Sequence, residues 1–114
     1  MSEDAEDADP QAERLHVVVM RDSYEVTVVV EGVLDRSGAE EFRACVMEAL
    51  GRRPAVVTVD ASALTSVDSP GMAGLLRVRH AVTDAGVVFR VSGASPALWR
   101  VAELAGFKAL LPDE

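Results

Sequence analysis

Hydrophobic residues occupy every second position in two runs near the start of the chain, residues 15–20 and residues 24–31. This period of two is typical of β-strands. Only three residues separate the runs, and a connection that short joins antiparallel neighbours. Two compact apolar runs follow at 55–60 and 87–92, and both predict strands; the first is expected to be buried on both faces. The pattern therefore predicts a hairpin followed by two further strands.

Apolar residues at helical spacing predict three helices that alternate with these strands, following Asp35, Ser69 and Ser95. A serine is expected to cap the first turn of each helix: Ser37, Ser69 and Ser95. A glycine is expected to end each helix: Gly51, Gly86 and Gly106. The order β-β-α-β-α-β-α predicts a single-domain α/β fold. Its sheet is expected to be mixed and mostly parallel, opened by an antiparallel hairpin, with the helices packed against it.

The apolar stripes also predict which face of each helix is buried. In the first helix the stripe includes Cys45, which we expect in the core. The residues expected to face inward in the second helix are Gly71, Leu75, Val78 and Val82, with Met72 and Leu76 at the margin. The residues expected to face inward in the third helix are Leu98, Val101, Ala102 and Ala105.

Length and charge limit the chain to one small domain. Its 114 residues suffice for a single hydrophobic core. The formal net charge is −8, but residues 1–13 hold six acids and no Lys or Arg, which leaves 13 acids against 11 bases from Arg14 onward. We therefore expect a disordered acidic tail at 1–13 and a folded domain at 14–114. The nearly neutral balance of the folded part does not favour a nucleic-acid partner.

The sequence carries no signal for a membrane or for secretion. No apolar run approaches the roughly 20 residues of a membrane helix, and Met1 is followed by acids rather than by a basic and an apolar segment. The single cysteine, Cys45, excludes an internal disulfide and a Cys-rich metal site. These features predict a cytoplasmic protein.

Motifs of common enzyme classes are missing as well. The sequence has no phosphate-binding loop, dinucleotide fingerprint, zinc-protease helix or hydrolase nucleophile elbow. Its two histidines, His16 and His80, are expected to be ordinary strand and surface residues. We therefore expect a protein without catalytic activity, metal site or cofactor.

One segment, Thr65–Met72, combines polar groups in an unusual place. It puts a carboxylate and a hydroxyl, Asp68 and Ser69, where a parallel strand meets the start of a helix, which is where functional groups gather in open α/β sheets. The same serine is also suited to cap the helix, a role worth about 1 kcal/mol. The residues alone leave both roles open.

Six segments after Leu15 occur together in a recognisable order. They are Gly32-Val33-Leu34-Asp35, Ala39-Glu40-Glu41-Phe42, Val57-Thr58-Val59-Asp60-Ala61-Ser62, Val67-Asp68-Ser69-Pro70-Gly71-Met72-Ala73-Gly74-Leu75-Leu76, Ser95-Pro96-Ala97 and Leu104-Ala105-Gly106. Together they resemble a bacterial STAS domain of the anti-sigma-factor-antagonist family, and the most specific piece is the D-S-x-G segment at 68–71.

The resemblance implies a partner-switching regulator. In that family an anti-sigma factor with serine kinase activity phosphorylates the serine matching Ser69, and only the unphosphorylated antagonist binds this factor and frees the sigma factor. A phosphatase is the implied second partner. The residues that the resemblance assigns to partner binding are Asp35, Asp68, Ser69, Gly71, Met72 and Leu76.

One departure from the family keeps an alternative open. The family commonly has a small residue after the phosphorylated serine, whereas this chain has Pro70, which stiffens the segment and lacks an N–H. A STAS protein that is not phosphorylated is the alternative, acting as a constitutive scaffold or as an accessory subunit of a larger assembly such as a transporter. A small-ligand sensor that uses the crevice between strand and helix is the third reading.

Overall fold

The computed structural model of the chain describes residues 14–112. The predicted disordered tail, residues 1–13, lies outside the described residues. The elements, in chain order, are β2 (Leu15–Arg21), β3 (Glu25–Leu34), α1 (Arg36–Leu50), β4 (Val56–Val67), α2 (Ser69–Asp84), β5 (Val88–Ala94), α3 (Pro96–Ala105) and the 3₁₀ turn η2 (Lys108–Leu110). This order confirms the predicted α/β alternation after an opening hairpin.

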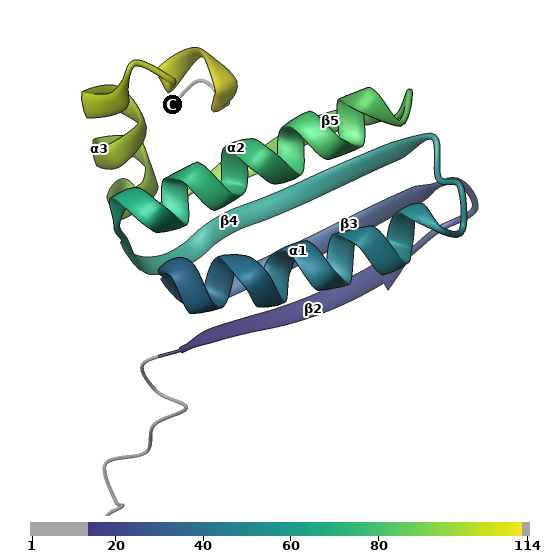
Figure 1. The fold of residues 1–114 in the computed structure, drawn as a ribbon, viewed down its shortest axis with the longest axis horizontal. Helices are drawn as coiled ribbons and strands as arrows, with labels where there is room; N and C mark the ends of the chain where they lie inside the picture. The colour runs from purple at the N-terminus through teal and green to yellow at the C-terminus, as the bar shows by residue number, and fades with distance from the viewer. Residues whose placement is uncertain (1–13, 113–114) are drawn as a thin grey trace, which may run out of the picture.

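The strands form one sheet in the order β2-β3-β4-β5 (Figure 1). β2 and β3 are antiparallel, whereas β3 pairs with β4, and β4 with β5, in parallel. The sheet is therefore mixed and mostly parallel, as predicted. In such a sheet β3 and β4 run in the same direction, so their carboxyl ends, and the starts of α1 and α2, lie at the same end of the molecule (Figure 1).

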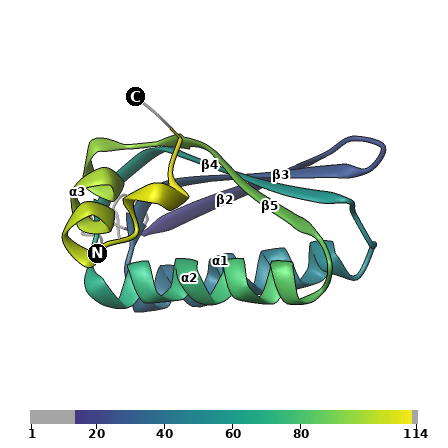
Figure 2. The same ribbon diagram turned by 90° about the horizontal axis from the view of Figure 1, so that it is seen from above.

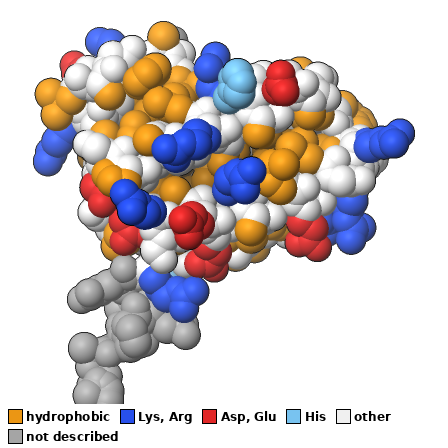
Figure 3. Space-filling model, viewed as in Figure 1, with side chains coloured by type: hydrophobic (Ala, Val, Ile, Leu, Met, Phe, Trp, Pro, Cys, Tyr) orange, Lys and Arg blue, Asp and Glu red, His pale blue; other side chains and the backbone are white. Residues whose placement is uncertain are grey.

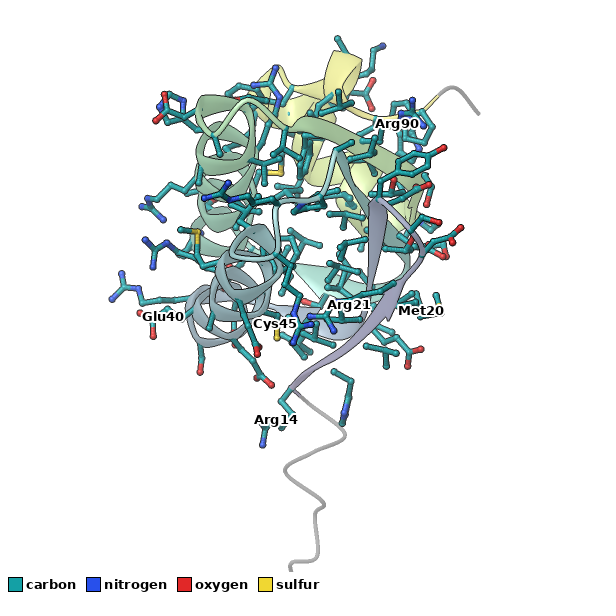
Figure 4. The ribbon with its side chains drawn as sticks, turned by 90° about the vertical axis from the view of Figure 1, so that its right-hand side faces the viewer. Arg14, Met20, Arg21, Glu40, Cys45 and Arg90 are labelled. Carbon is teal, nitrogen blue, oxygen red and sulfur yellow. The ribbon has the colours of Figure 1, made fainter. Side chains whose placement is uncertain are left out.

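Helices α1 and α2 lie side by side against one face of the sheet, and α3 lies at one end of it (Figure 2). Alternate residues of β3, namely Val26, Val28 and Val30, are buried. The opposite face of the sheet is more open: Met20 is 52% exposed and points away from α1 and α2 (Figure 4). The core therefore lies between the sheet and the two long helices.

The two long helices touch each other closely at Gly74. A Cβ atom added to Gly74 of α2 would lie 2.3 Å from the Cβ of Ala39 in α1. Only glycine permits this approach, because a larger residue would push the helices apart. The contact fixes the spacing of α1 and α2 near their amino ends.

β4 is much longer than the strand predicted at 55–60, because it continues to Val67. In its second half only Ala61 and Leu64 are buried, and the residues after each of them, such as Ser62 and Thr65, are exposed, so no compact apolar run marks it. This part pairs with β3 across two register shifts. The prediction recognised only the half that is apolar on both faces.

Three predictions of burial were wrong or incomplete. Met72, expected at the margin of the second helix, is 3% exposed, because α2 contacts α3 and α1 as well as the sheet. Ala105, expected to face inward, is exposed at the end of α3, where the chain turns away at Gly106 with a φ of 83°. Cys45, expected in the core, is only half-buried. Trp99 is half-buried against the core.

Candidate functional site

Two aspartates lie next to each other at the carboxyl end of the sheet. Leu34 and Val67, the last residues of β3 and β4, are register partners, so Asp35 and Asp68 follow at neighbouring positions. Each aspartate is the N-cap of the helix that follows it. The strand pairing therefore brings the two helix starts together with one carboxylate at each.

The two caps have the same geometry. Asp35 Oδ1 accepts a hydrogen bond from the N–H of Gly38, and Asp68 Oδ1 accepts one from the N–H of Gly71, both at 2.8 Å. Both caps thus use an aspartate and a glycine three residues later. Carboxylates at these positions satisfy a first-turn N–H and interact favourably with the positive end of the helix dipole.

This finding corrects the predicted caps of the first two helices. Ser37 and Ser69 lie inside the first turns of α1 and α2 and are exposed. The helices begin earlier than expected, because the residue directly after each strand is itself an excellent N-cap. Ser95 is the N-cap of α3, as predicted, and its hydroxyl accepts from the N–H of Leu98 at 3.1 Å.

Gly71 lets the start of α2 lie directly against the end of β3. A Cβ atom at this position would come within 1.9 Å of the carbonyl oxygen of Leu34. The N–H of Asp68 donates to the same carbonyl at 3.3 Å. Glycine is therefore needed at position 71 for a structural reason that does not involve any partner, namely the close approach of two backbones.

Ser69 is the first residue of α2, exposed between the cap Asp68 and Pro70. Its hydroxyl makes no hydrogen bond to any other described residue. Pro70 is in the first turn, where an N–H has no partner within the helix, so it breaks no helical hydrogen bond. The helix start thus presents a free hydroxyl on a rigid turn.

The structure brings four of the six predicted partner-binding residues together and places the other two elsewhere. Asp35, Asp68, Ser69 and Gly71 lie together around the helix starts. Met72 is buried, so its side chain is not part of the surface beside Ser69. Leu76 is half-buried and lines a separate cavity with Phe107 and Leu110.

A groove between α1 and α2, of about 670 Å³, was missed by the sequence analysis. Ser69 and Pro70 lie at one end of it, and three arginines also line it: Arg36, Arg43 and Arg77. Side chains of Lys and Arg are prominent on this face of the molecule (Figure 3). The positions of these arginines on each helix can be read from the sequence. That they line one groove depends on how the two helices pack, which the sequence pattern does not report.

Cys45 lies on α1 near two acidic residues of the same helix, Glu41 and Glu48. Burial, followed by the negative charges of Glu41 and Glu48, raises the pKa of its thiol. A raised pKa lowers the fraction of reactive thiolate at neutral pH. This is the opposite of the shift that activates a cysteine nucleophile.

Within residues 14–112, no group of three or more His, Cys, Asp or Glu side chains is arranged to hold a metal ion. None of the helices in the same range has the length and apolar character needed to cross a bilayer.

Comparison with solved structures finds the same fold in anti-sigma factor antagonists. One from Mycobacterium paratuberculosis has a TM-score of 0.73 at 21% identity, over 86% of this chain and 83% of that chain. The antagonist SpoIIAA in its unphosphorylated form has a TM-score of 0.73 at 18% identity, over 87% and 88%. The phosphorylated form of the Bacillus cell fate determinant SpoIIAA has a TM-score of 0.67 at 19% identity, over 87% and 91%.

Comparison of the sequence gives the family. No curated protein sequence matches this chain. A family model described as the Mlab STAS domain matches residues 17–112, which is most of the chain. The chain therefore belongs to the STAS domain family.

Proposed function

We propose that this chain is an anti-sigma factor antagonist whose binding to an anti-sigma factor is switched off by phosphorylation of Ser69. One observation carries the proposal: Ser69 presents a free, exposed hydroxyl at the start of α2, while the neighbouring Asp68 caps the helix. The similarity in fold to anti-sigma factor antagonists supports the choice of partner.

A phosphate on Ser69 would act on the partner rather than on the fold. It adds about −1.5 to −2 charge, and a helix start tolerates an anion well. The same charge would join Asp68 and Asp35 on one surface. Like charges held in an interface that excludes water are strongly unfavourable, and a penalty of about 3 to 4 kcal/mol weakens binding roughly 10² to 10³-fold.

In this proposal the chain is the substrate of a kinase and has no catalytic activity of its own. ATP and the catalytic base belong to the anti-sigma factor, which is the serine kinase, and a phosphatase restores the active antagonist. The reaction takes place in the cytoplasm, where ATP and sigma factors are found. The raised pKa of the Cys45 thiol is consistent with a protein that does not use this group in chemistry.

Incubation with an anti-sigma factor kinase from the same organism and ATP tests the proposal. Intact-mass measurement should show one added phosphate, and peptide mapping should place it on Ser69. Ser69→Ala should abolish it. Ser37→Ala is the matched control, because Ser37 is an exposed serine in the first turn of α1, behind the same type of aspartate cap. A phosphate that persists in Ser69→Ala or disappears in Ser37→Ala would contradict the proposal.

Pro70 favours one alternative, a STAS protein that binds its partner constitutively. A kinase must fit the residues around Ser69 into its active site, and Pro70 fixes the backbone there in the first turn of α2. In that case the protein is a scaffold or an accessory subunit of a larger assembly. Absence of phosphate after incubation, with equal binding of Ser69→Asp and the unchanged protein, would select this alternative.

A further inference from the structure

Three arginines face the groove between α1 and α2 without a charge partner. Arg36 and Arg43 come from α1, and Arg77 comes from α2. All three are exposed, and no hydrogen bond or ion pair joins them to another residue in the part of the chain that the structure describes. Among residues 14–112, Glu40 is the only one that lines this groove with a carboxylate. The groove therefore carries a local excess of positive charge.

Small residues form the floor of the groove. Ala39 and Gly74 are buried where the two helices touch, and Ala73 is half-buried beside them. The other uncharged residues of the lining are Ser69 and Pro70, so a strip of small residues lies between the charged side chains. Hydrophobic and basic side chains lie next to each other on this face of the molecule (Figure 3). The strip and its flanking cations suit an elongated ligand with one apolar side and acidic edges.

The groove carries positive charge, whereas the chain as a whole is negatively charged. The formal net charge is −8, and even from Arg14 onward acids outnumber bases by 13 to 11. A general excess of arginine therefore does not explain the cluster. Unpaired arginines beside an apolar strip are typical of protein interfaces, in which arginine is enriched and binds carboxylates with two parallel hydrogen bonds.

We propose that the groove between α1 and α2 docks an acidic, amphipathic segment of the anti-sigma factor. The apolar side of this segment lies on Ala39 and Ala73, and its carboxylates bind Arg36, Arg43 and Arg77. The inference rests on the proposed function, because it names the chemistry that the partner brings to the same site.

The position of Ser69 connects this docking to the switch. Ser69 lines the groove at the end where Arg36 begins α1. A phosphate there would repel the carboxylates of the docked segment and would offer Arg36 an anion from the chain itself. Phosphorylation and docking are therefore expected to exclude each other.

Charge reversal tests the docking directly. The full-length variant R36E/R43E/R77E changes the groove, and R21E/R90E/R100E is the matched control, with the same change in net charge at exposed sites outside the groove. Dissociation constants for the anti-sigma factor are measured by calorimetry. We expect at least a tenfold loss for the groove variant and less than about threefold for the control. Equal losses in the two variants would overturn the proposal.

Phosphorylation of Ser69 by the kinase is measured on the same proteins, so the two proposals can fail separately. If Ser69 is phosphorylated in the unchanged protein but the groove and control variants bind alike, the docking inference fails and the proposed function stands. If no kinase modifies Ser69, the proposed function fails, and a second measurement still decides the chemistry of the groove.

That second measurement is an NMR titration of the full chain with a helical peptide made of Glu, Ala and Leu. The amides of Ala39 and Ala73 should shift, whereas a peptide with Lys in place of Glu should leave them unchanged. R36E/R43E/R77E should lose the response. Shifts confined to other surfaces would overturn the proposal. A further variant, studied without peptide, has the six acids of residues 1–13 changed to amides. Shifts of the Ala39 and Ala73 amides in this variant would also overturn the proposal, because they would mean that the chain itself occupies the groove.

Discussion

Replacing the buried Gly71 by alanine should destabilise the fold more than the same change at any other described glycine whose φ lies outside the left-handed region. Gly71 lies in the first turn of α2, where its Cα faces the end of β3. The added Cβ would lie 1.9 Å from the oxygen and 2.6 Å from the carbon of the Leu34 carbonyl. Both contacts involve backbone, so no side chain can rotate to relieve them.

The expected cost follows from what must move. The first turn of α2 has to withdraw by about 1 Å, and overpacking of this kind costs about 1 to 3 kcal/mol. The withdrawal also weakens the hydrogen bond from the Asp68 N–H to the Leu34 carbonyl, worth about 1 kcal/mol. Alanine recovers about 0.4 to 1 kcal/mol through the lower entropy of the unfolded chain. We expect a net loss of about 1 to 3.5 kcal/mol in the free energy of unfolding.

Urea unfolding of Gly71→Ala and Gly86→Ala measures this loss against a control. A Cβ at Gly86 meets no atom within 4 Å, but its φ of 79° is unfavourable for alanine and should cost about 1 kcal/mol. The pair therefore separates a backbone clash from backbone strain. The reasoning is refuted if Gly71→Ala, at an unchanged m-value, loses no more free energy than Gly86→Ala.

Three further predictions concern the cap, the switch and the thiol. Asp68→Ala should lower the free energy of unfolding by about 1 kcal/mol, like Ser95→Ala, whereas Ser69→Ala should change it by less than about 0.5 kcal/mol, as thermal or urea unfolding can show. A loss in Ser69→Ala as large as in Asp68→Ala would contradict the assigned cap. Ser69→Asp should keep the fold, with stability unchanged or slightly raised by the helix dipole, and should lose the anti-sigma factor in a pull-down; retained binding would contradict the switch. Because the pKa of Cys45 is raised, iodoacetamide should alkylate it more slowly than a cysteine peptide at pH 8, with the rate rising only at higher pH, and equal rates would contradict the assignment.

The sequence predicted the order of elements well because periodicity reports local geometry. The hairpin at 15–31 and the helix cap at Ser95 needed only neighbouring residues, and both are present. The second half of β4 was missed, since its exposed face carries serine and threonine, as in Ser62 and Thr65, and this hid a strand buried mainly on one face.

The candidate site was predicted in part, and its errors have a physical cause. The family resemblance named both Asp35 and Asp68, and the structure brings them together at the ends of two paired strands. Which residue caps each helix could not be decided, because aspartate and serine are equally good N-caps and two positions competed. The contacts of Gly71 with β3 and of Gly74 with α1 depend on tertiary packing, which no local pattern reports.

The two aspartate caps bear on the choice between a structural and a regulatory Ser69. Asp35 and Gly38 build the same capped turn as Asp68 and Gly71, but Arg36 takes the place of Ser69 as the first helical residue. The fold therefore needs the aspartate and the glycine of this turn and does not need a serine at its first helical position. Because the cap belongs to Asp68, a phosphate on Ser69 displaces no hydrogen bond within the described chain. Such a residue can change the charge of a surface while the helix beneath it stays in place, which is what a reversible switch of partner affinity requires.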